Sequence, residues 1–272
     1  ALTAPAAEAE VAWCAAKRRT ARLRAGTGFA PRVCELTRGL YAVTGGLGGR
    51  GRRAATLLVE GGASRVLLAS RSGRLVRDGQ GFEPPLLAMG EVAALFACDS
   101  ADTRNANELV TRASLAGVLH AAGVLRDMML RALSADSLET SYAPKAGGAS
   151  HLQRALSGRQ QLEAFGLFSS VASTFGSVGQ ANYAAANAYL DALAAARRRG
   201  GTFGSSLQIP AVSGAGMGAR TFGKEQLDAL GAVSLDEFAS RLAHGLTPAF
   251  AGAESIQALL NRKLADVMHA GT

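Results

Sequence analysis

Short apolar runs alternate with segments of helical periodicity along most of the chain. Seven runs have the length and apolar character of buried strands, at residues 39–44, 64–70, 91–98, 115–119, 165–170, 205–210 and 255–260. Helical stretches lie between them, at residues 52–60, 134–156 and 181–199, and Ser234 is placed to cap a further amphipathic helix. Strands that alternate with helices predict an α/β fold built on a doubly wound parallel sheet.

Three stretches depart from this alternation. Residues 1–38 are rich in alanine and then basic. Two short strands are expected there, at residues 10–13 and 20–23. Glycines and prolines discourage a long helix over residues 72–91, where we expect a variable loop and a shortened helix. A glycine-rich turn and a helical lid are expected over about 211–232. We therefore divide the chain into an N-terminal linker, 1–38, and a main domain, 39–272.

The 272 residues are 48% hydrophobic and 18% charged, which is enough for a full globular core. No stretch has the roughly 18 consecutive apolar residues of a membrane helix, and the N-terminus lacks a signal-peptide pattern. The three cysteines lack metal-ligand spacing, which favours a reducing compartment without disulfides and predicts no metal site. We expect a cytoplasmic protein that binds no membrane. The missing initiator methionine indicates a piece of a longer chain.

The net charge of +8 has two interpretations. It favours an anionic partner, such as a dinucleotide, an acidic carrier protein or nucleic acid, or it reflects solvated arginine-rich surfaces. The basic clusters at 17–19 and 197–199 lack interleaved aromatic residues, and only 6% of the chain is aromatic. Nucleic-acid binding relies on stacking as well as charge and is therefore not expected.

A glycine-rich turn follows the first main strand and opens a helix. The strand ends at Thr44, the turn reads Gly45-Gly46-Leu47-Gly48-Gly49-Arg50-Gly51, and a helix follows from Arg52. Glycines let the backbone approach a pyrophosphate closely, and the free N–H groups and dipole of the helix favour the anion. These features predict a dinucleotide site that includes Thr44, Gly45, Gly46, Leu47, Gly48, Gly49 and Gly51.

Residues at the ends of the next strands extend this predicted site. The second main strand ends at Ser70 and Arg71, and an arginine in place of an acidic residue accommodates a ribose 2′-phosphate, so NADPH is the expected cofactor. Asp99 follows the third strand in a context typical of a helix cap. Small residues follow the fourth strand and allow close approach of a cofactor: Ala121, Ala122 and Gly123. His120, before them, has no Ser or Asp at triad spacing and is expected to be structural.

A hydroxyl, a phenol and an amide gather near the strand at 165–170. This strand carries Ser170 to its carboxyl end, and a glycine-broken loop leads into the alanine-rich helix that carries Tyr183. Tyr183 and Asn187 are four residues apart and therefore share a face of this helix. Their convergence with Ser170 at a strand end predicts an active site.

This stretch resembles the catalytic segment of the short-chain dehydrogenase/reductase superfamily, and in particular the ketoreductase domain of modular polyketide synthases. Ser170 and Tyr183 are thirteen positions apart, and Asn187 follows Tyr183 after three alanines, as in that family. Residues 44–51 fit its TGxxxGxG pattern, and Lys145 stands where the ketoreductases place their lysine. The resemblance covers the chain from about residue 8 onward. It implies a Rossmann-like fold, preceded by the remnant of a truncated structural subdomain.

The resemblance also implies a reaction and a role for each residue. Tyr183 would donate a proton to a ketone oxygen as NADPH delivers hydride to its carbon. A free phenol has a pKa of about 10, which a nearby Lys145 ammonium would lower. Ser170 would hydrogen-bond the carbonyl oxygen, Asn187 would hold a proton relay, and Asp99 would contact the adenine amine. Tyr183 and Lys145 would also bind the cofactor. The substrate would be a β-ketoacyl thioester on the phosphopantetheine arm of an acyl carrier protein, with the other domains of a multidomain synthase as partners.

Three residues are implied to influence the configuration of the product: Asp127, Asn182 and Met217. Asp127 keeps the last aspartate of the Leu-Asp-Asp motif of one ketoreductase subtype, and Asn182 precedes the tyrosine as in that subtype. Val178 replaces its usual proline, while Phe175 stands where the opposite subtype has tryptophan. The balance favours the D-configured (3R) alcohol. The family's Trp-Gly-Pro-Trp is replaced by Ile-Pro-Ala-Val at 209–212, a departure expected near the nicotinamide and the lid.

Two alternatives are left open. The equivalent domain of a multifunctional fatty acid synthase has the same motifs, although residues 125–127 and the upstream segment favour a polyketide synthase. A catalytically silent, structural domain is an alternative of another class. Such domains lose the tyrosine, the asparagine or the glycine turn, all of which this chain keeps. Cofactor binding separates this last alternative from an enzyme.

Overall fold

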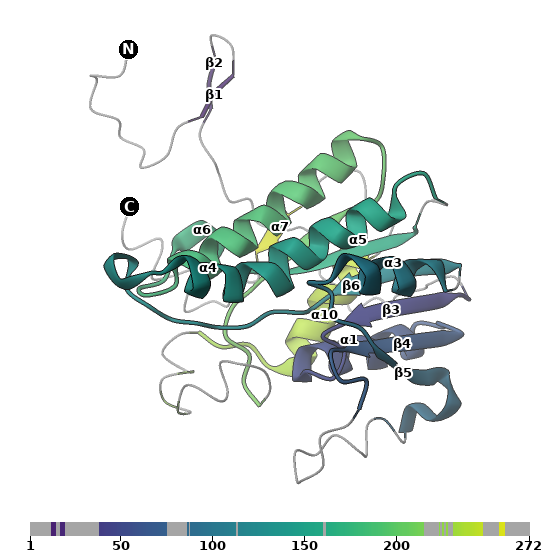
Figure 1. Ribbon diagram of the computed structural model, residues 1–272. Helices are drawn as coiled ribbons and strands as arrows, with labels where there is room; N and C mark the ends of the chain where they lie inside the picture. Colours follow the sequence, from purple (N-terminus) through teal and green to yellow (C-terminus); the bar gives the residue numbers. More distant parts are fainter. Residues whose placement is uncertain are drawn as a thin grey trace. The chain divides into compact units, whose positions relative to one another are not determined.

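Seven parallel strands form the sheet that organises the protein, shown as a computed structural model in Figure 1. In sheet order they are β5 (Ala93–Ala97), β4 (Arg65–Ser70), β3 (Leu40–Thr44), β6 (Leu115–His120), β7 (Ala164–Ser170), β8 (Ser205–Ile209) and β9 (Ile256–Ala258). Every neighbouring pair is parallel. The strand order reverses between β3 and β6, because the chain crosses back over the sheet after β5. The predicted doubly wound α/β sheet is confirmed.

The structure describes residues 12–14, 17–19, 38–74, 86, 88–112, 114–159, 162–214, 223, 225, 227, 231–246 and 256–258. The chain divides into two units, Ala1–Pro31 and Arg32–Thr272. In the first unit, β1 (Ala12–Cys14) and β2 (Lys17–Arg19) form an antiparallel pair. The strand expected at 10–13 therefore lies close to its predicted position. The second described strand precedes the expected one, whose residues are not among those described. The boundary at residue 38 stays a prediction.

Helices cover both faces of the sheet (Figure 1). On one face lie α1 (Gly49–Glu60) and α10 (Leu235–Leu246), and on the other lie α3 (Thr103–Thr111), α5 (Gly148–Leu156) and α7 (Ala181–Arg199). Two shorter helices contact α7, namely α4 (Ala135–Tyr142) and α6 (Ala172–Phe175). The described parts of the chain contain no helix that is both long and apolar enough to cross a bilayer.

The start of α10 confirms the predicted cap. The Ser234 hydroxyl accepts the backbone N–H of Glu237 at 3.1 Å, and the Glu237 carboxylate accepts the N–H of Ser234 at 2.7 Å. This reciprocal pair is a capping box, which satisfies two N–H groups that the helix itself leaves free.

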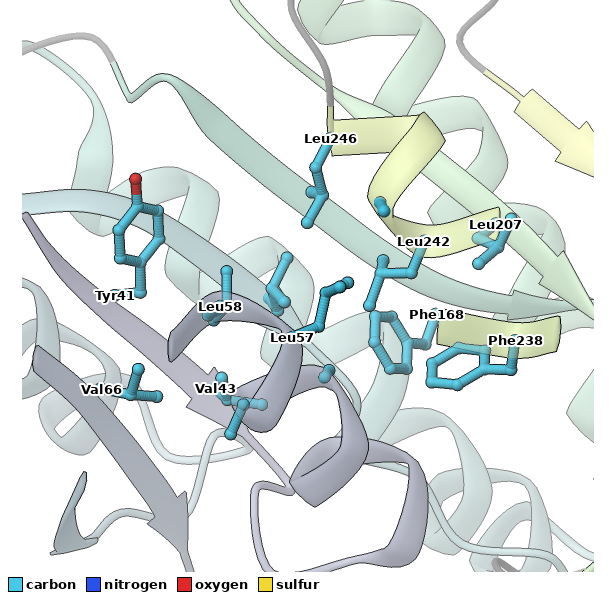
Figure 2. Close-up of a cluster of buried hydrophobic side chains, with 14 of the residues drawn as sticks. Tyr41, Val43, Leu57, Leu58, Val66, Phe168, Leu207, Phe238, Leu242 and Leu246 are labelled. Carbon is cyan, nitrogen blue, oxygen red and sulfur yellow. The ribbon is translucent and has the colours of Figure 1, made fainter. Parts of the chain in front are cut away.

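Alternate residues of the strands face two separate cores. In β3, Tyr41 and Val43 belong to the core that α1 and α10 cover, whereas Ala42 belongs to the opposite core. Figure 2 shows the first core, where the rings of Phe168 and Phe238 meet edge to face with centroids 5.4 Å apart. Because both faces of the sheet are covered, both faces of its strands are apolar, and the sequence shows them as continuous runs.

The helix predicted over 134–156 is interrupted in its middle. It consists of α4, a π-helical turn η3 (Ala143–Gly147) and α5. Pro144 explains the change, because proline has no N–H and its ring clashes with the carbonyl four residues earlier in an α-helix. The wider turn continues the helix and carries Lys145 into the interior, where the residue is 2% exposed.

One capping prediction is wrong, because Asp102 and not Asp99 caps α3. The Asp102 carboxylate accepts the N–H of Asn105 at 2.8 Å. Asp99 lies in the preceding turn, where its side chain accepts the N–H of Ala101 at 3.0 Å. The variable loop and the lid predicted over 72–91 and 211–232 lie largely outside the described residues.

Candidate active site

A cleft of about 650 Å³ opens at the carboxyl ends of β3, β4, β5 and β6, beside the point where the strand order reverses. Ten residues predicted for the dinucleotide site line it: Gly45, Gly48, Gly49, Gly51, Ser70, Arg71, Asp99, Ala121, Ala122 and Gly123. They come from four segments, each of which follows a different strand. The sequence therefore located the cleft correctly, while the contacts to a cofactor stay a prediction.

Three glycines of the turn leave no room for a Cβ: Gly45, Gly46 and Gly51. Gly45 has a φ of +65°, and a Cβ placed on it would lie 2.8 Å from the backbone of Ala121. A Cβ on Gly51 would overlap the carbonyl oxygen of Gly45. The helix α1 therefore begins tightly against the turn, without a side-chain cap or an acidic residue in its first turn. Its first N–H groups are free to bind an anion.

Five residues predicted for the cofactor do not line the cleft: Thr44, Gly46, Leu47, Lys145 and Tyr183. The first three are used within the fold. The Thr44 hydroxyl lies 2.7 Å from a ring nitrogen of His120. The N–H of Gly46 donates to the Ala69 carbonyl oxygen at 3.1 Å, and Leu47 packs against the core. These contacts hold the glycine turn against the neighbouring strands.

The Lys145 ammonium is buried next to the wall of the cleft. A Cβ on Gly123, which lines the cleft, would lie 3.0 Å from Lys145 Cε. Lys145 Nζ donates a hydrogen bond to the Phe168 carbonyl oxygen at 2.7 Å and lies 5.5 Å from the centre of the Tyr183 ring. Burial lowers the pKa of Lys145 to about 8, against an opposing effect of Tyr183. The ammonium is therefore charged at neutral pH.

Two cations act on Tyr183, which is 5% exposed. Burial by itself would raise the pKa of this phenol. The charges of Lys145 and Arg50 outweigh burial, so the pKa lies below its ordinary value. The Asn187 amide makes a smaller contribution. A phenol with a lowered pKa is better suited to exchange a proton near neutral pH.

Asn187 lies one turn after Tyr183 on α7. Its Nδ2 donates to the Tyr183 backbone carbonyl oxygen at 2.7 Å, and the backbone carbonyl oxygen of Asn187 accepts from the Ser169 hydroxyl at 3.3 Å. Its Oδ1 is buried and has no hydrogen-bond partner among the described residues. Buried acceptors are normally paired with protein or with water. This oxygen is therefore available to the relay expected of Asn187.

Ser170 ends β7, and a buried carboxylate fixes the segment that follows it. Asp191 accepts hydrogen bonds at 2.7 Å, 2.5 Å and 2.8 Å from the side chains of Ser173, Ser206 and Gln208, respectively. The Ser173 hydroxyl also lies 2.8 Å from the Ser170 carbonyl oxygen. Asp191 thus joins α7 to β8 and to the segment after Ser170.

His120 joins three elements behind the site. It is fully buried, with Nδ1 2.7 Å from the Thr44 hydroxyl and Nε2 2.8 Å from the Lys145 carbonyl oxygen. A carbonyl oxygen only accepts, so Nε2 carries the proton and Nδ1 accepts from Thr44. Burial, together with the charge of Lys145, lowers the pKa of His120 to about 4, so the imidazole is neutral at pH 7. These contacts give His120 a structural role, as the sequence predicted.

The fold and this site can be compared with known proteins. Residues 39–214 match the family model described as KR domain. The chain belongs to the ketoreductase (KR) domain family. Polyketide synthase GfsA of Streptomyces halstedii is 45% identical over 175 residues, which cover 62% of the chain and 2% of that synthase. Spectinabilin polyketide synthase system protein NorB of Streptomyces orinoci is 40% identical over 196 residues, which cover 70% of the chain and 9% of that protein.

Solved ketoreductases have the same fold as this KR domain. The first ketoreductase of the tylosin PKS is 34% identical with a TM-score of 0.80, and the match covers 97% of this chain and 58% of that chain. An A1-type ketoreductase is 28% identical with a TM-score of 0.80, and the match covers 97% and 60% of the two chains. KR domains are oxidoreductases of the short-chain dehydrogenase/reductase superfamily, whose ketoreductases bind a nicotinamide cofactor. This chain spans only a small part of the synthases that it matches.

The residues predicted to influence product configuration differ in their surroundings. Asp127 is exposed and accepts a hydrogen bond from the Gln180 amide at 3.0 Å. Asn182 is buried: its Nδ2 donates to the Arg126 carbonyl oxygen at 2.9 Å, and its Oδ1 accepts the N–H of the next residue at 2.8 Å. Nδ2 also donates to the Ser141 hydroxyl of α4 at 3.1 Å. Because both ends of its amide are used, any effect of Asn182 on the substrate passes through the segment at Arg126 or through α4. Met217 lies outside the described residues.

Eight further residues line the cleft: Arg50, Cys98, Ser100, Ala101, Val124, Arg126, Thr140 and Pro144. Most of them are adjacent in the sequence to a predicted residue, so this adjacency could have identified them as cleft residues. Thr140 gave no such signal, because it comes from α4, which does not directly follow a strand. Asp191 was also missed, although it continues the four-residue spacing of Tyr183 and Asn187 along α7.

Because His120 is neutral in the folded protein, the stability of the fold decreases as the pH becomes acidic. Because its pKa is about 4 in the folded KR domain and about 6.5 when unfolded, the unfolded chain binds a proton that the fold excludes. The free energy of unfolding should therefore fall by about 3 kcal/mol as the pH drops from 6.5 to 4. Denaturant titrations across this range should show a smaller fall for His120→Gln, which cannot bind that proton. An equal fall in both proteins would contradict the assignment.

Proposed function

We propose that this KR domain uses NADPH to reduce a β-ketoacyl thioester, held on the phosphopantetheine arm of an acyl carrier protein, to the β-hydroxyacyl thioester. The observation that carries the proposal is the buried Lys145 ammonium 5.5 Å from the Tyr183 ring, next to the wall of the cleft. The carrier protein and the other synthase domains are proposed as partners because the relatives are multidomain polyketide synthases. Those relatives also favour a polyketide over a fatty acid synthase.

The residues of the cleft suit NADPH. The glycine turn, which leaves no room for a Cβ, would admit the pyrophosphate next to the free N–H groups of α1. Ser70 and Arg71, at the end of β4, would hold the ribose 2′-phosphate, and Asp99 would accept from the adenine amine. When bound, NADPH supplies the hydride that reduces the carbonyl carbon.

The side chains of the KR domain supply the proton and hold the developing charge. Tyr183 donates its phenolic proton to the carbonyl oxygen, and the Lys145 ammonium stabilises the phenolate that is left. The Ser170 hydroxyl donates a hydrogen bond to the same oxygen and stabilises its developing negative charge. Asn187 Oδ1, a buried acceptor without a partner among the described residues, holds the group that returns a proton to Tyr183.

The catalytically silent alternative has less support. Tyr183, Asn187 and the glycine turn are all present, and the pKa of Tyr183 is lowered by two cations despite burial. In a domain without catalytic activity, nothing would offset the cost of burying the Lys145 ammonium, because a buried charge that is only partly paired destabilises the fold.

Replacing Tyr183 with phenylalanine removes only the proton donor. NADPH oxidation with a diffusible β-ketoacyl thioester or a simple cyclic ketone should fall by about 10²–10⁴-fold, since general acid catalysis contributes this much. NADPH affinity should stay within a few-fold. Tyr189→Phe is the matched control, because it removes a hydroxyl from the same helix, where the ring packs on Tyr142. The assay is the loss of NADPH absorbance.

The outcomes of this assay separate the hypotheses. Retained turnover in Tyr183→Phe would remove Tyr183 from its role. Saturable NADPH binding without turnover in the unmodified protein would mean that the carrier or further synthase segments are needed. Neither binding nor turnover would support the structural alternative.

Arg71 should determine the preference for NADPH over NADH. Arg71→Ala removes a charged partner of the 2′-phosphate, and hydrogen bonds to charged groups contribute roughly 1.5–3 kcal/mol. The dissociation constant of NADPH should therefore rise about 10- to 100-fold, with that of NADH nearly unchanged. Arg74→Ala, three residues further along, is the control because Arg74 does not line the cleft. Fluorescence titration with both nucleotides measures the effect, and equal losses for both would contradict it.

Asp127 should favour the D-configured (3R) alcohol. We expect the unmodified KR domain to give this product in excess, and we expect Asp127→Ala to reduce the excess. Asp127→Asn keeps the size of the side chain beside Gln180 and tests whether the charge is needed. Chiral chromatography of the product decides the matter. An excess of the L alcohol from the unmodified protein would overturn the assignment.

A further inference from the structure

The Ser170 hydroxyl is oriented by a backbone N–H that lies just beyond it in the chain. Its Oγ accepts a hydrogen bond from the N–H of Ala172 at 3.2 Å, and Ser170 is 8% exposed. A hydroxyl has one proton to donate and two positions at which it accepts. Among the described residues, none accepts the proton of this hydroxyl. The Ala172 N–H therefore fixes one acceptor position of Ser170 and leaves its proton free for a substrate oxygen.

Ala172 is the first residue of α6, a helix of four residues that packing alone does not hold. Helices this short are not stable by themselves in water. Only Ala172 of this helix is buried, and Phe175, at its end, is 39% exposed. The backbone pairing of β7 with β8 ends one residue earlier, where the Val171 N–H donates to the Ile209 carbonyl oxygen at 3.3 Å. The direction of the Ala172 N–H therefore depends on what ties α6 to the rest of the fold.

Two hydroxyls of α6 supply this tie, and both reach one polar cluster on α7 and β8. The Ser173 hydroxyl donates to Asp191 Oδ2 at 2.7 Å. The Thr174 hydroxyl donates to Gln208 Oε1 at 2.9 Å, and Gln208 Nε2 donates to Asp191 Oδ2 at 2.8 Å. Asp191 is 7% exposed, and hydrogen bonds to a carboxylate are stronger than those between neutral groups. The bond from Ser173 to Asp191 is therefore the stronger of the two ties.

Ser173 also contacts Ser170 itself. Its hydroxyl oxygen lies 2.8 Å from the Ser170 carbonyl oxygen and 2.7 Å from Asp191 Oδ2, so two acceptors share one proton. A contact with the carbonyl oxygen three residues earlier is common for serine. The contact with Asp191 is different, because it joins residues 18 positions apart. Since α7 carries both Asp191 and Tyr183, Ser173 connects Ser170 to the helix of the phenol.

We propose that Ser173 is a positioning residue, which, held by Asp191, sets the direction of the Ser170 hydroxyl relative to Tyr183. The inference rests on the proposed function, in which Ser170 and Tyr183 act on the same carbonyl oxygen. Both groups must reach that oxygen at hydrogen-bond distance, and a small displacement of such a donor lowers the rate strongly. Ser173 needs no contact with the substrate or the cofactor for this role, because it acts through Ser170.

A double-mutant cycle with Ser170 tests this role. Ser170→Ala removes the oxyanion donor and should lower kcat by about 10²–10³-fold. Ser173→Ala keeps the donor but loosens α6, and should lower kcat by about 10-fold with little change in KM. In the Ser170→Ala background, Ser173→Ala should have no further effect, because the group that it positions is gone. Ser173→Thr keeps a hydroxyl and should restore most of the activity. Loss of NADPH absorbance gives these rates.

Ser206→Ala is the matched control. The Ser206 hydroxyl donates to the other oxygen of the same carboxylate, Asp191 Oδ1, but Ser206 lies on β8 and not on α6. Its kcat should stay close to that of the unmodified protein. An equal loss in Ser206→Ala would overturn the proposal, and so would an undiminished effect of Ser173→Ala in the Ser170→Ala background. Circular dichroism confirms that each variant is folded.

Hydrogen exchange separates this inference from the proposed function. The Ala172 N–H exchanges with deuterium when its bond to Ser170 opens, so Ser173→Ala should speed this exchange by about 10-fold or more, as expected for the loss of a hydrogen bond to a charged group. Ser206→Ala should leave it unchanged. The measurement, by NMR, uses neither NADPH nor a ketone. If the unmodified domain proves inactive, faster exchange in Ser173→Ala alone still supports the positioning of the hydroxyl, and equal rates overturn it. An active domain whose cycle is additive keeps the proposed function and loses this inference.

Discussion

The burial of one ammonium group constrains the structure around it. Lys145 is 2% exposed, and a charge removed from water destabilises a fold unless it is paired. The Phe168 carbonyl oxygen and the Tyr183 ring supply that pairing only in part, since the pKa of Lys145 still falls to about 8. Lys145 reaches this depth because Pro144 converts one turn of helix into a π-helical turn and because Gly123 has no side chain in the way. Pro144, the π-helical turn and Gly123 thus all make room for the buried Lys145 side chain.

The same requirement connects the site to both cores of the molecule. Phe168 offers its carbonyl oxygen to Lys145, while its ring packs against Phe238 in the core beneath α10 (Figure 2). On the other face, Asp191 holds α7 against β8 and the segment after Ser170. Because close-packed interiors transmit displacements, a substitution in either core shifts the position of Lys145 or Tyr183 even where the substituted residue does not contact them.

The sequence predicted those parts of the protein that follow from local patterns. Buried parallel strands are apolar runs, and glycines at a strand end mark close approach of backbone, so the sheet and most of the cleft could be found in advance. Contacts between segments that are far apart in the sequence could not be predicted. The position of Asn182 next to Tyr183 did not reveal that the Asn182 side-chain amide donates a hydrogen bond to the Arg126 carbonyl oxygen. Nor did the glycine turn show that the charge of Arg50 lowers the pKa of Tyr183, because nothing in the local pattern distinguishes it from a solvated arginine.

Burial also sets which groups of the site carry charge. A protonated His120 would add a third positive charge to those of Lys145 and Arg50. Full burial prevents this by lowering the pKa of the imidazole to about 4, and the neutral ring then donates to the Lys145 carbonyl oxygen. Lys145 is buried as deeply, but it starts from a much higher pKa and also gains from the nearby phenol, so it stays charged up to about pH 8. Between these two values the imidazole is neutral and the ammonium is charged. The charge state that Tyr183 requires therefore follows from how deeply its neighbours are buried and from their residue types, more than from any single hydrogen bond.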